Sequence, residues 1–199
     1  MTGVQTCALP ISVGVAPPGS WRAPVPPTVF VVAFELEPVA PELDVMIVPW
    51  TRNEGGALAG LKTISYAENV RALAYVEERG AQEAIFANTK NNLCEATGSN
   101  VFFVLDGVCC TPPVSAGCLN GVTRQLLLEL GPGIGIPVEE RDAPIDALRN
   151  AEEAFVSSTT REVQPIAAVD GRPLPACPGP IATRLAAAFT DLTRRDIDP

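Results

Sequence analysis

The sequence of 199 residues contains no histidine and only two lysines, against twelve arginines. Without histidine, a Ser-His-Asp triad and any proton relay through imidazole are excluded. Acid–base chemistry must therefore use lysine, carboxylates, tyrosine or a bound cofactor. The scarcity of lysine directs attention to Lys62 and Lys90, because an amine can condense with an aldehyde whereas a guanidinium cannot. Lys90 lies in a polar turn, so Lys62 is the stronger candidate.

The cysteines give little support for a metal site. The sequence has no CxxC pair, and structural zinc sites are usually built from such pairs, often together with histidine. We therefore expect no metal, and we interpret the cysteines as buried or unreactive thiols of a cytoplasmic protein. They are Cys7, Cys94, Cys109, Cys110, Cys118 and Cys177.

Charge and hydrophobicity argue against nucleic-acid and membrane partners. The net charge is −9, whereas binding to phosphate backbones needs clustered positive charge. No apolar run approaches the roughly 18 residues that a membrane-spanning helix requires. The hydrophobic content of 47% and the charged content of 19% are typical of a globular protein.

The amino-terminal residues differ in character from the rest. Residues 1–12 lack the basic and apolar regions of a signal peptide. They resemble the translation of a sequencing adapter, and we interpret them as an artefact; a disordered native tail is the alternative. Residues 13–27 are rich in proline and glycine without periodicity, so we expect a disordered linker.

From residue 28 onward the patterns predict a mixed α+β domain. Runs of β-branched and aromatic residues predict strands over 28–34, 44–50, 84–87, 101–105, 108–111, 137–142, 154–156 and 163–169. Apolar residues at helical spacing predict helices from Ser65 to Gly80, from Gly121, over 145–151 and from Pro180 to Leu192. The Gly131-Pro132-Gly133 segment should end the second helix early and loosen its packing, because proline disrupts a helix interior.

Four short segments carry the candidate functional residues. They are residues 61–63 (LKT), 93–102 (LCEATGSNVF), 119–124 (LNGVTR) and 157–163 (SSTTREV). In this order and spacing they resemble the class IV aminotransferases, the fold-type IV enzymes that use pyridoxal 5'-phosphate (PLP). That family includes branched-chain and D-amino acid aminotransferases and aminodeoxychorismate lyase. The resemblance implies the large carboxy-terminal domain of this fold, with a mixed, barrel-like sheet and flanking helices.

The resemblance implies roles for three residues around the cofactor ring. Lys62 would form the Schiff base with PLP and move the proton between substrate and cofactor. Glu95 would face the ring nitrogen, since a protonated pyridinium is the electron sink. Tyr66 is a candidate partner for the phenolic oxygen; the alternative is an aromatic residue that packs on the core.

The phosphate is expected to meet two other segments. Gly121, Val122 and Thr123 open a helix, and free backbone N–H groups at a helix start form an anion site. By resemblance, Ser158 and Thr159 would also bind the phosphate.

The same resemblance places the substrate carboxylate at Thr160. Arg124 and Arg161 are expected to form structural ion pairs.

In the family a smaller amino-terminal domain supplies a phosphate-binding arginine and part of the substrate pocket. We expect most of that domain to be missing here. Residues 28–50 would be its remnant strands and the connection, and residues 51–199 the PLP-binding domain. Since a neighbouring subunit contributes to the pocket in the family, the resemblance also implies a homodimer.

Three functions remain open. The first is an aminotransferase that moves an amino group between an amino acid and a 2-oxo acid, which Tyr66 mildly favours. The second is aminodeoxychorismate lyase of the folate pathway, which releases pyruvate and leaves 4-aminobenzoate. The third is an inactive fragment of either enzyme. Only transamination requires a 2-oxo acid acceptor for turnover.

Overall fold

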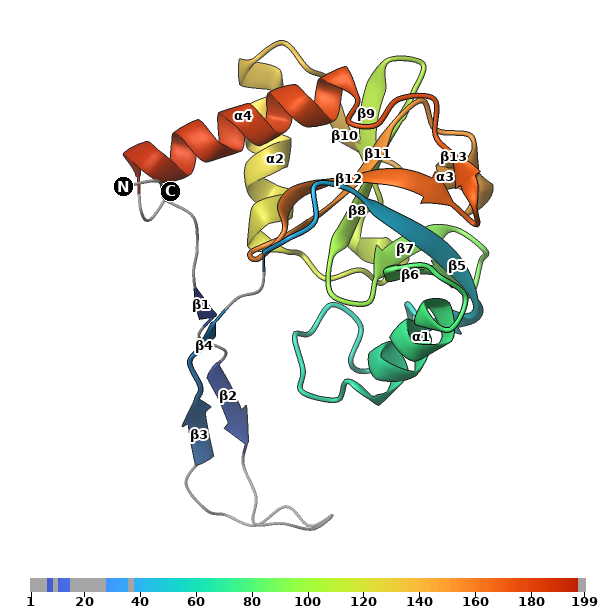
Figure 1. Ribbon diagram of the computed structural model, residues 1–199. Helices are drawn as coiled ribbons and strands as arrows, with labels where there is room; N and C mark the ends of the chain where they lie inside the picture. The colour runs from blue at the N-terminus through green and yellow to red at the C-terminus, as the bar shows by residue number, and fades with distance from the viewer. Residues whose placement is uncertain (1–6, 9–10, 15–27, 36–37, 197–199) are drawn as a thin grey trace. The chain divides into compact units, whose positions relative to one another are not determined.

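The computed structural model describes residues 7–8, 11–14, 28–35 and 38–196 (Figure 1). The chain divides into two compact units, Met1–Val39 and Ala40–Pro199. In the first unit, β1 (Cys7–Ala8) pairs with β4 (Phe34–Glu35), and β2 (Ile11–Gly14) pairs with β3 (Thr28–Val31), both antiparallel. The strand expected over 28–34 is therefore present as two short strands.

The interpretation of residues 1–12 as an artefact stays a prediction. Within that segment the structure places β1 and the start of β2 in pairs with later residues. β2 also continues to Gly14, at the start of the expected linker. The remainder of that linker, residues 15–27, lies outside the described residues.

A nine-stranded mixed sheet is the framework of the second unit. Its order is β10-β9-β8-β11-β12-β5-β6-β7, with β13 paired to β12. β5 pairs in parallel with both β12 and β6. The strands are β5 (Leu43–Arg52), β6 (Glu83–Asn88), β7 (Leu93–Ala96), β8 (Asn100–Leu105), β9 (Val108–Thr111), β10 (Val138–Glu140), β11 (Ala154–Ser158), β12 (Glu162–Val169) and β13 (Arg172–Pro173). This mixed sheet with its helices confirms the predicted α+β class.

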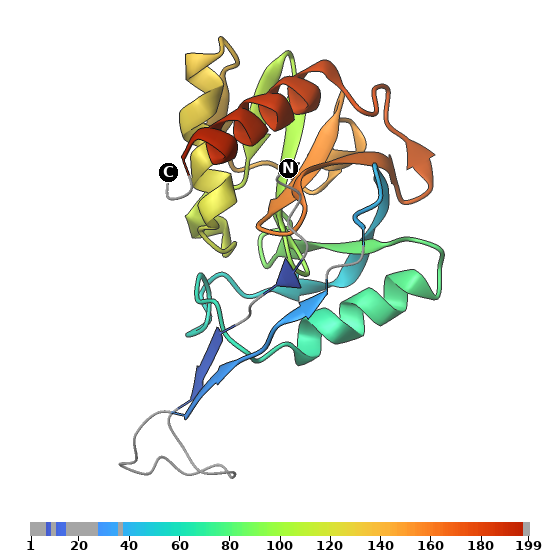
Figure 2. The same cartoon turned by 60° about the vertical axis from the view of Figure 1, so that its left-hand side comes forward.

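Helices cover the sheet in two places. α1 (Ala67–Glu77) packs on β5 and β6, whereas α2 (Val122–Gly133) and α4 (Pro180–Arg195) lie side by side over β11 and β12 (Figures 1 and 2). The short α3 (Asp146–Arg149) and the 3-10 turn η1 (Val114–Ala116) belong to connections. Within the described residues, no helix has the length and apolar character needed to cross a membrane.

The central strands are buried on both faces, which explains their continuous apolar sequences. In β8, Phe102 and Val104 join the cluster beneath α2 and α4, while Val101 and Phe103 join the cluster on the other face. Successive side chains of a strand point to opposite faces, so burial of both faces requires an unbroken apolar run. The ring of Phe102 stacks on that of Phe155, with centroids 4.8 Å apart.

The predicted start of the first helix was wrong in detail. Its N-cap is Tyr66 and not Ser65, and no side chain caps the helix. Val70, one of the apolar residues at helical spacing in this segment, is exposed, whereas Ala72 and Val76 are buried. Residues at positions i and i+2 of an α-helix, such as Val70 and Ala72, point in nearly opposite directions because the helix has 3.6 residues per turn. Val70 therefore faces away from the sheet.

The predicted early end of the second helix was also wrong. α2 includes Pro132 and ends at Gly133. Pro132 lies in the last turn, so its missing N–H removes only one bond near a helix end. The packing there is tight and not loosened, because a Cβ on Gly131 would overlap the Val138 side chain of β10. The close contact between this helix end and β10 therefore depends on glycine.

Candidate active site

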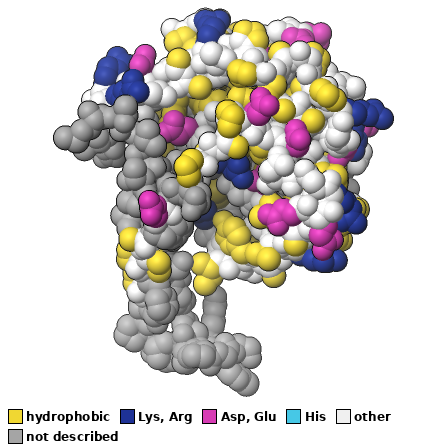
Figure 3. All heavy atoms as spheres, in the orientation of Figure 1, with side chains coloured by type: hydrophobic (Ala, Val, Ile, Leu, Met, Phe, Trp, Pro, Cys, Tyr) yellow, Lys and Arg dark blue, Asp and Glu magenta, His cyan; other side chains and the backbone are white. Residues whose placement is uncertain are grey.

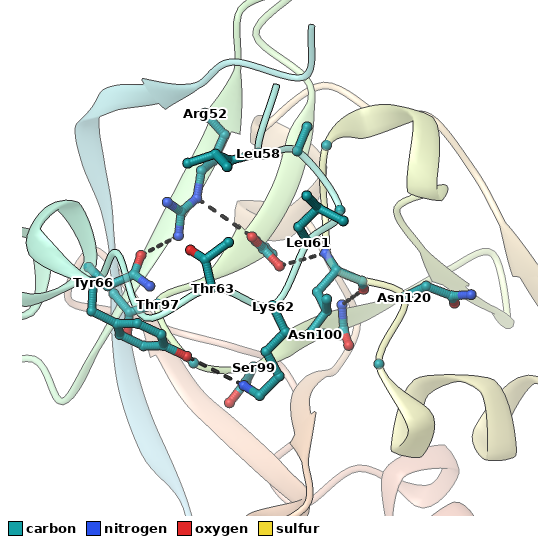
Figure 4. A pocket seen from close by; sticks show the side chains of 18 of the residues that line it. Arg52, Leu58, Leu61, Lys62, Thr63, Tyr66, Thr97, Ser99, Asn100 and Asn120 are labelled. Carbon is teal, nitrogen blue, oxygen red and sulfur yellow. Dashed lines mark hydrogen bonds and ion pairs between the residues drawn. The ribbon is translucent and has the colours of Figure 1, made fainter. Parts of the chain in front are cut away.

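One pocket with a volume of about 850 Å³ brings the four motif segments together (Figure 4). It lies between the loop that precedes α1, the end of β7, the start of α2 and the end of β11. The predicted residues that line it are Lys62, Tyr66, Glu95, Gly121, Val122, Thr123, Ser158 and Thr159. Predicted residues as far as 97 positions apart in the sequence, Lys62 and Thr159, thus share one cavity.

Lys62 and Tyr66 occupy one wall of the pocket. Lys62 is exposed in the loop between β5 and α1, and its Nζ lies 3.5 Å from the Tyr66 hydroxyl oxygen (Figure 4). Tyr66 stands directly before α1, with 40% of the residue exposed. The tyrosine therefore faces the lysine and the pocket, and the alternative of a core aromatic is wrong.

Glu95 reaches the pocket from β7. Its neighbours Cys94 and Ala96 are buried in the core, so the alternation of the strand turns the carboxylate toward the cavity. One carboxylate oxygen, Oε2, accepts a hydrogen bond of 2.9 Å from the Leu119 N–H, and the other, Oε1, lies 3.6 Å from Arg52 Nε. Burial raises the pKa of Glu95, while the Leu119 N–H and the positive charges of Arg52 and Lys62 act in the opposite direction.

The start of α2 forms a second wall. Gly121 is the N-cap of this helix, and the first turn of a helix presents backbone N–H groups without partners inside the helix. A Cβ on Gly121 would overlap the Asn100 side-chain oxygen. Asn100 in turn donates a 2.7 Å hydrogen bond to the Leu119 carbonyl. Glycine is therefore needed for the helix to begin this close to β8.

Two buried hydroxyl groups at the pocket have no hydrogen-bond partner in the described part of the chain. Ser99 and Ser157 line the cavity with 7% and 1% of the residue exposed, and neither hydroxyl has a hydrogen bond among the residues that the structure describes. Buried polar atoms nearly always have a partner. Together with the helix start, Ser158 and Thr159, these hydroxyls supply hydrogen-bond donors suited to a phosphate. Sequence reasoning missed both serines as site residues, although they belong to the quoted motifs.

The turn between β11 and β12 separates Thr160 from the other predicted residues. Thr160 is exposed, and its hydroxyl oxygen lies 3.4 Å from that of Ser158. Ser158 also accepts a hydrogen bond from the Arg161 N–H. The structure does not bring Thr160 into the pocket lining, so its proposed contact with a substrate carboxylate stays a prediction.

The two motif arginines form ion pairs, as expected. Arg161 contacts the buried Glu83 at 3.3 Å, and Glu83 also accepts hydrogen bonds from the backbone and hydroxyl of Thr97. This carboxylate thus ties the turn after β11 to the turn after β7. Arg124 pairs with Glu140 and donates to the Pro112 carbonyl at 2.8 Å.

The cysteine thiols of the second unit are free and poorly reactive. Cys94, Cys109, Cys110 and Cys118 are buried, and burial raises the pKa of Cys118 to about 11. A thiol with such a pKa stays protonated at neutral pH and is a weak nucleophile. Within the described residues, no group of three or more potential metal ligands is present.

Comparison with known proteins agrees with this geometry. The family model for amino-transferase class IV matches residues 7–169. The chain belongs to this family. It is 38% identical over 129 residues to a branched-chain-amino-acid aminotransferase of Pseudomonas aeruginosa, covering 64% of this chain and 42% of that protein. It is 35% identical over 130 residues to a D-alanine aminotransferase of Staphylococcus aureus, covering 65% of this chain and 46% of the relative.

Solved structures share the fold of this class IV chain. The branched-chain amino acid aminotransferase from Thermobaculum terrenum, determined in its PLP form, superposes with a TM-score of 0.77 at 29% identity, covering 86% of this chain and 59% of that structure. A Legionella pneumophila protein provisionally assigned as 4-amino-4-deoxychorismate lyase gives a TM-score of 0.84 at 23% identity, covering 91% and 67%. The chain spans about half the length of the two curated relatives above.

Proposed function

We propose that this chain is the PLP-binding part of an aminotransferase of the branched-chain or D-amino acid type, with Lys62 as the Schiff-base lysine. The observation that carries the proposal is the shared pocket: the amine of Lys62 and the carboxylate of Glu95 line one cavity with a helix start and two serine hydroxyls that have no partner among the described residues. An amine for an aldehyde, a carboxylate for a ring nitrogen and donors for a phosphate are the groups that PLP requires.

When bound, PLP supplies an electron sink for the reacting substrate carbon. The chain's own residues bind, orient and move protons around it. The Lys62 amine would hold the cofactor through its aldehyde, with loss of water, and as a free amine it would carry the proton to and from the substrate carbon. Tyr66, 3.5 Å from that amine, holds its direction. Glu95, whose carboxylate is fixed by the Leu119 N–H, would accept a hydrogen bond from the protonated ring nitrogen.

The part of the pocket proposed to bind the phosphate is formed by the start of α2 and nearby hydroxyl groups. The N–H groups at the start of α2 favour negative charge. We assign phosphate contacts to Gly121, Val122, Thr123, Ser158 and Thr159, as the motifs predicted. Ser99 and Ser157 extend this set, because a bound phosphate would give their buried hydroxyls the acceptor that they lack.

We further propose that the substrates are an amino acid and a 2-oxo acid, and that the enzyme is a homodimer. Leu58, Leu61 and Val122 line the pocket although 58%, 61% and 68% of these residues are exposed. Figure 3 shows hydrophobic side chains gathered on the surface over the loop before α1. Apolar surface gathered beside a site is typical of regions that other protein surface covers, which supports a pocket completed by further chain or a second subunit.

The two lysines allow a matched test. Adding PLP to the purified protein is expected to produce the visible absorption band of a lysine-bound cofactor. The Lys62→Ala substitution should abolish the band, whereas Lys90→Ala should leave it unchanged, since Lys90 lies in the polar turn after β6. A band that persists in Lys62→Ala would overturn the assignment.

Substrate assays then separate the three functions. Transamination proceeds beyond one amino acid per active site only when a 2-oxo acid is present to take up the amino group. Aminodeoxychorismate lyase would release pyruvate and 4-aminobenzoate without an acceptor. A band without turnover of either substrate indicates an inactive fragment.

A further inference from the structure

We propose that Arg52 is the positioning residue for Glu95, holding its carboxylate charged and directed into the pocket. This inference rests on the proposed function, because it gives Glu95 its partner for a ring nitrogen. Arg52 was not among the predicted site residues. It ends β5, 43 positions before Glu95 in the sequence, and it lines the same pocket.

The sheet brings the two side chains together. β6 lies between β5 and β7, and Phe86 of β6 stands opposite Glu95 in register. The Arg52 guanidinium carbon lies 4.2 Å from the centroid of the Phe86 ring, so the cation rests on the aromatic face. From there its Nε is 3.6 Å from Glu95 Oε1, and the two side chains are only 18% and 17% exposed.

The other nitrogens of Arg52 are held by the first turn of α1. Nη1 pairs with Glu68, and Nη2 donates to the Asn69 side-chain oxygen. Nε is buried and makes no hydrogen bond within the described part of the chain. With both terminal nitrogens engaged and Phe86 beneath, the guanidinium has one free direction for interaction, toward Glu95 (Figure 4).

The surrounding charges explain why this arginine matters. The charged groups acting on Glu95 are Arg52 from β5, Lys62 from the loop and Glu68 from α1, together with the Leu119 N–H. Burial and Glu68 favour the neutral acid, whereas the two cations and the N–H favour the carboxylate. Under the proposed function the Lys62 amine is committed to the cofactor. Arg52 is then the cation of this group that takes no part in the chemistry.

Titration of Glu95 in the protein without PLP tests the inference directly. Carboxyl carbons labelled with ¹³C on glutamate are followed by NMR, with Glu95→Gln identifying the signal. Arg52→Gln is expected to raise the proton affinity of Glu95 by about tenfold or more, the usual effect of losing an opposite charge at this distance. Arg52→Lys should restore part of the change, since it retains the charge but not the fork of donors.

Arg79→Gln is the matched control. It removes the same charge from another arginine that stacks on an aromatic ring, that of Tyr75. Arg79 lies just beyond the C-terminal end of α1, whereas the first turn of this helix lines the pocket. This variant should leave the Glu95 titration unchanged. An equal shift of the Glu95 titration in Arg79→Gln and Arg52→Gln would overturn the inference. The shift would then reflect only the change in the net charge of the protein.

Two further measurements keep the outcomes distinct. Asn69→Ala removes one hydrogen-bond partner of Arg52 without changing the charge, and it should raise the proton affinity of Glu95 less than Arg52→Gln does. It also replaces Arg52→Gln as the test if that variant does not fold.

PLP affinity, from fluorescence titration, should fall in Arg52→Gln and recover partly in Arg52→Lys. A Glu95 shift without any PLP binding would contradict the proposed function and leave the Arg52 assignment standing. No Glu95 shift in Arg52→Gln or Asn69→Ala overturns the assignment.

Discussion

At the scale of single residues, Glu95 carries an electrostatic cost that should be visible in stability. Burial raises its folded-state pKa above the ordinary value of 4.5. The folded protein therefore binds this proton more tightly than the unfolded chain does. The stabilisation from protonation is fully present below pH 4.5 and is lost as the pH rises through the folded-state pKa.

Glu95→Gln should remove this pH dependence. We expect the free energy of unfolding of the original protein, relative to that of Glu95→Gln, to decrease from pH 4.5 toward neutral pH. Urea unfolding at several pH values measures the difference. A difference that increases with pH would mean that Arg52, Lys62 and the Leu119 N–H outweigh burial.

Substitution of Ser157 tests whether its hydroxyl serves PLP binding and not the stability of the fold. Ser157→Ala removes a buried hydroxyl that lacks a partner within the described residues, so the unfolding temperature without PLP should stay the same or rise. PLP affinity should fall roughly tenfold or more, as expected for loss of a hydrogen bond to a charged group. Ser115→Ala, in the exposed part of η1, is the control. A clear loss of stability in the absence of PLP would mean that Ser157 has a structural role.

At the scale of elements, α2 contains a matched pair of glycines near its end. Gly131→Ala should destabilise the protein by about 1–3 kcal/mol, because the added methyl overlaps Val138 and the well-packed contact cannot expand freely. A methyl group added in Gly133→Ala meets no atom within 4 Å among the described residues outside the adjoining helix backbone, so this change should be neutral or stabilising by up to about 1 kcal/mol. Thermal and urea unfolding of the two variants measure the contrast. Equal effects would mean that helix propensity, and not contact with β10, decides this position.

Strand β8 and the end of helix α2 show which elements the local sequence predicts and which it does not. The apolar run of β8 predicted a strand correctly, since burial on both faces leaves an unbroken signature. The end of α2 was mispredicted, because the constraint on Gly131 comes from Val138 on another element. The local sequence predicted that proline would end the helix, whereas the contact between Gly131 and Val138 favours a longer helix.

The site shows a similar division. The residues predicted to bind cofactor or substrate line one pocket, apart from Thr160, because the motifs that carry the resemblance to a family point to them. Arg52 was missed because its meaning depends on the neighbouring strand: only the order β5-β6-β7 places it beside Glu95. Ser99 and Ser157 were missed for a different reason. A serine in a motif gives no sign of whether its hydroxyl is buried or already bonded.

At the scale of the whole molecule, the second unit should fold without the first. The three hydrophobic clusters described for the chain lie between Leu43 and Phe189. A protein lacking Met1–Val39 is therefore expected to unfold within a few degrees of the full chain, as followed by circular dichroism. Removal of α4 is the contrasting change, because it takes Leu185 and Phe189 out of the core. Loss of a cooperative transition in the shorter protein would show that the first unit is needed for folding.

The position of β5 has a consequence for how the chain reaches this structure. It precedes the other strands of its sheet in the sequence, yet it lies between β6 and β12. During synthesis β6 becomes available soon after it, whereas β12 ends at Val169. One edge of an apolar strand thus stays open while more than a hundred further residues are translated. Such an edge is a template for pairing with other chains. A high rate of synthesis should therefore cause the nascent chain to aggregate more readily than the folded protein.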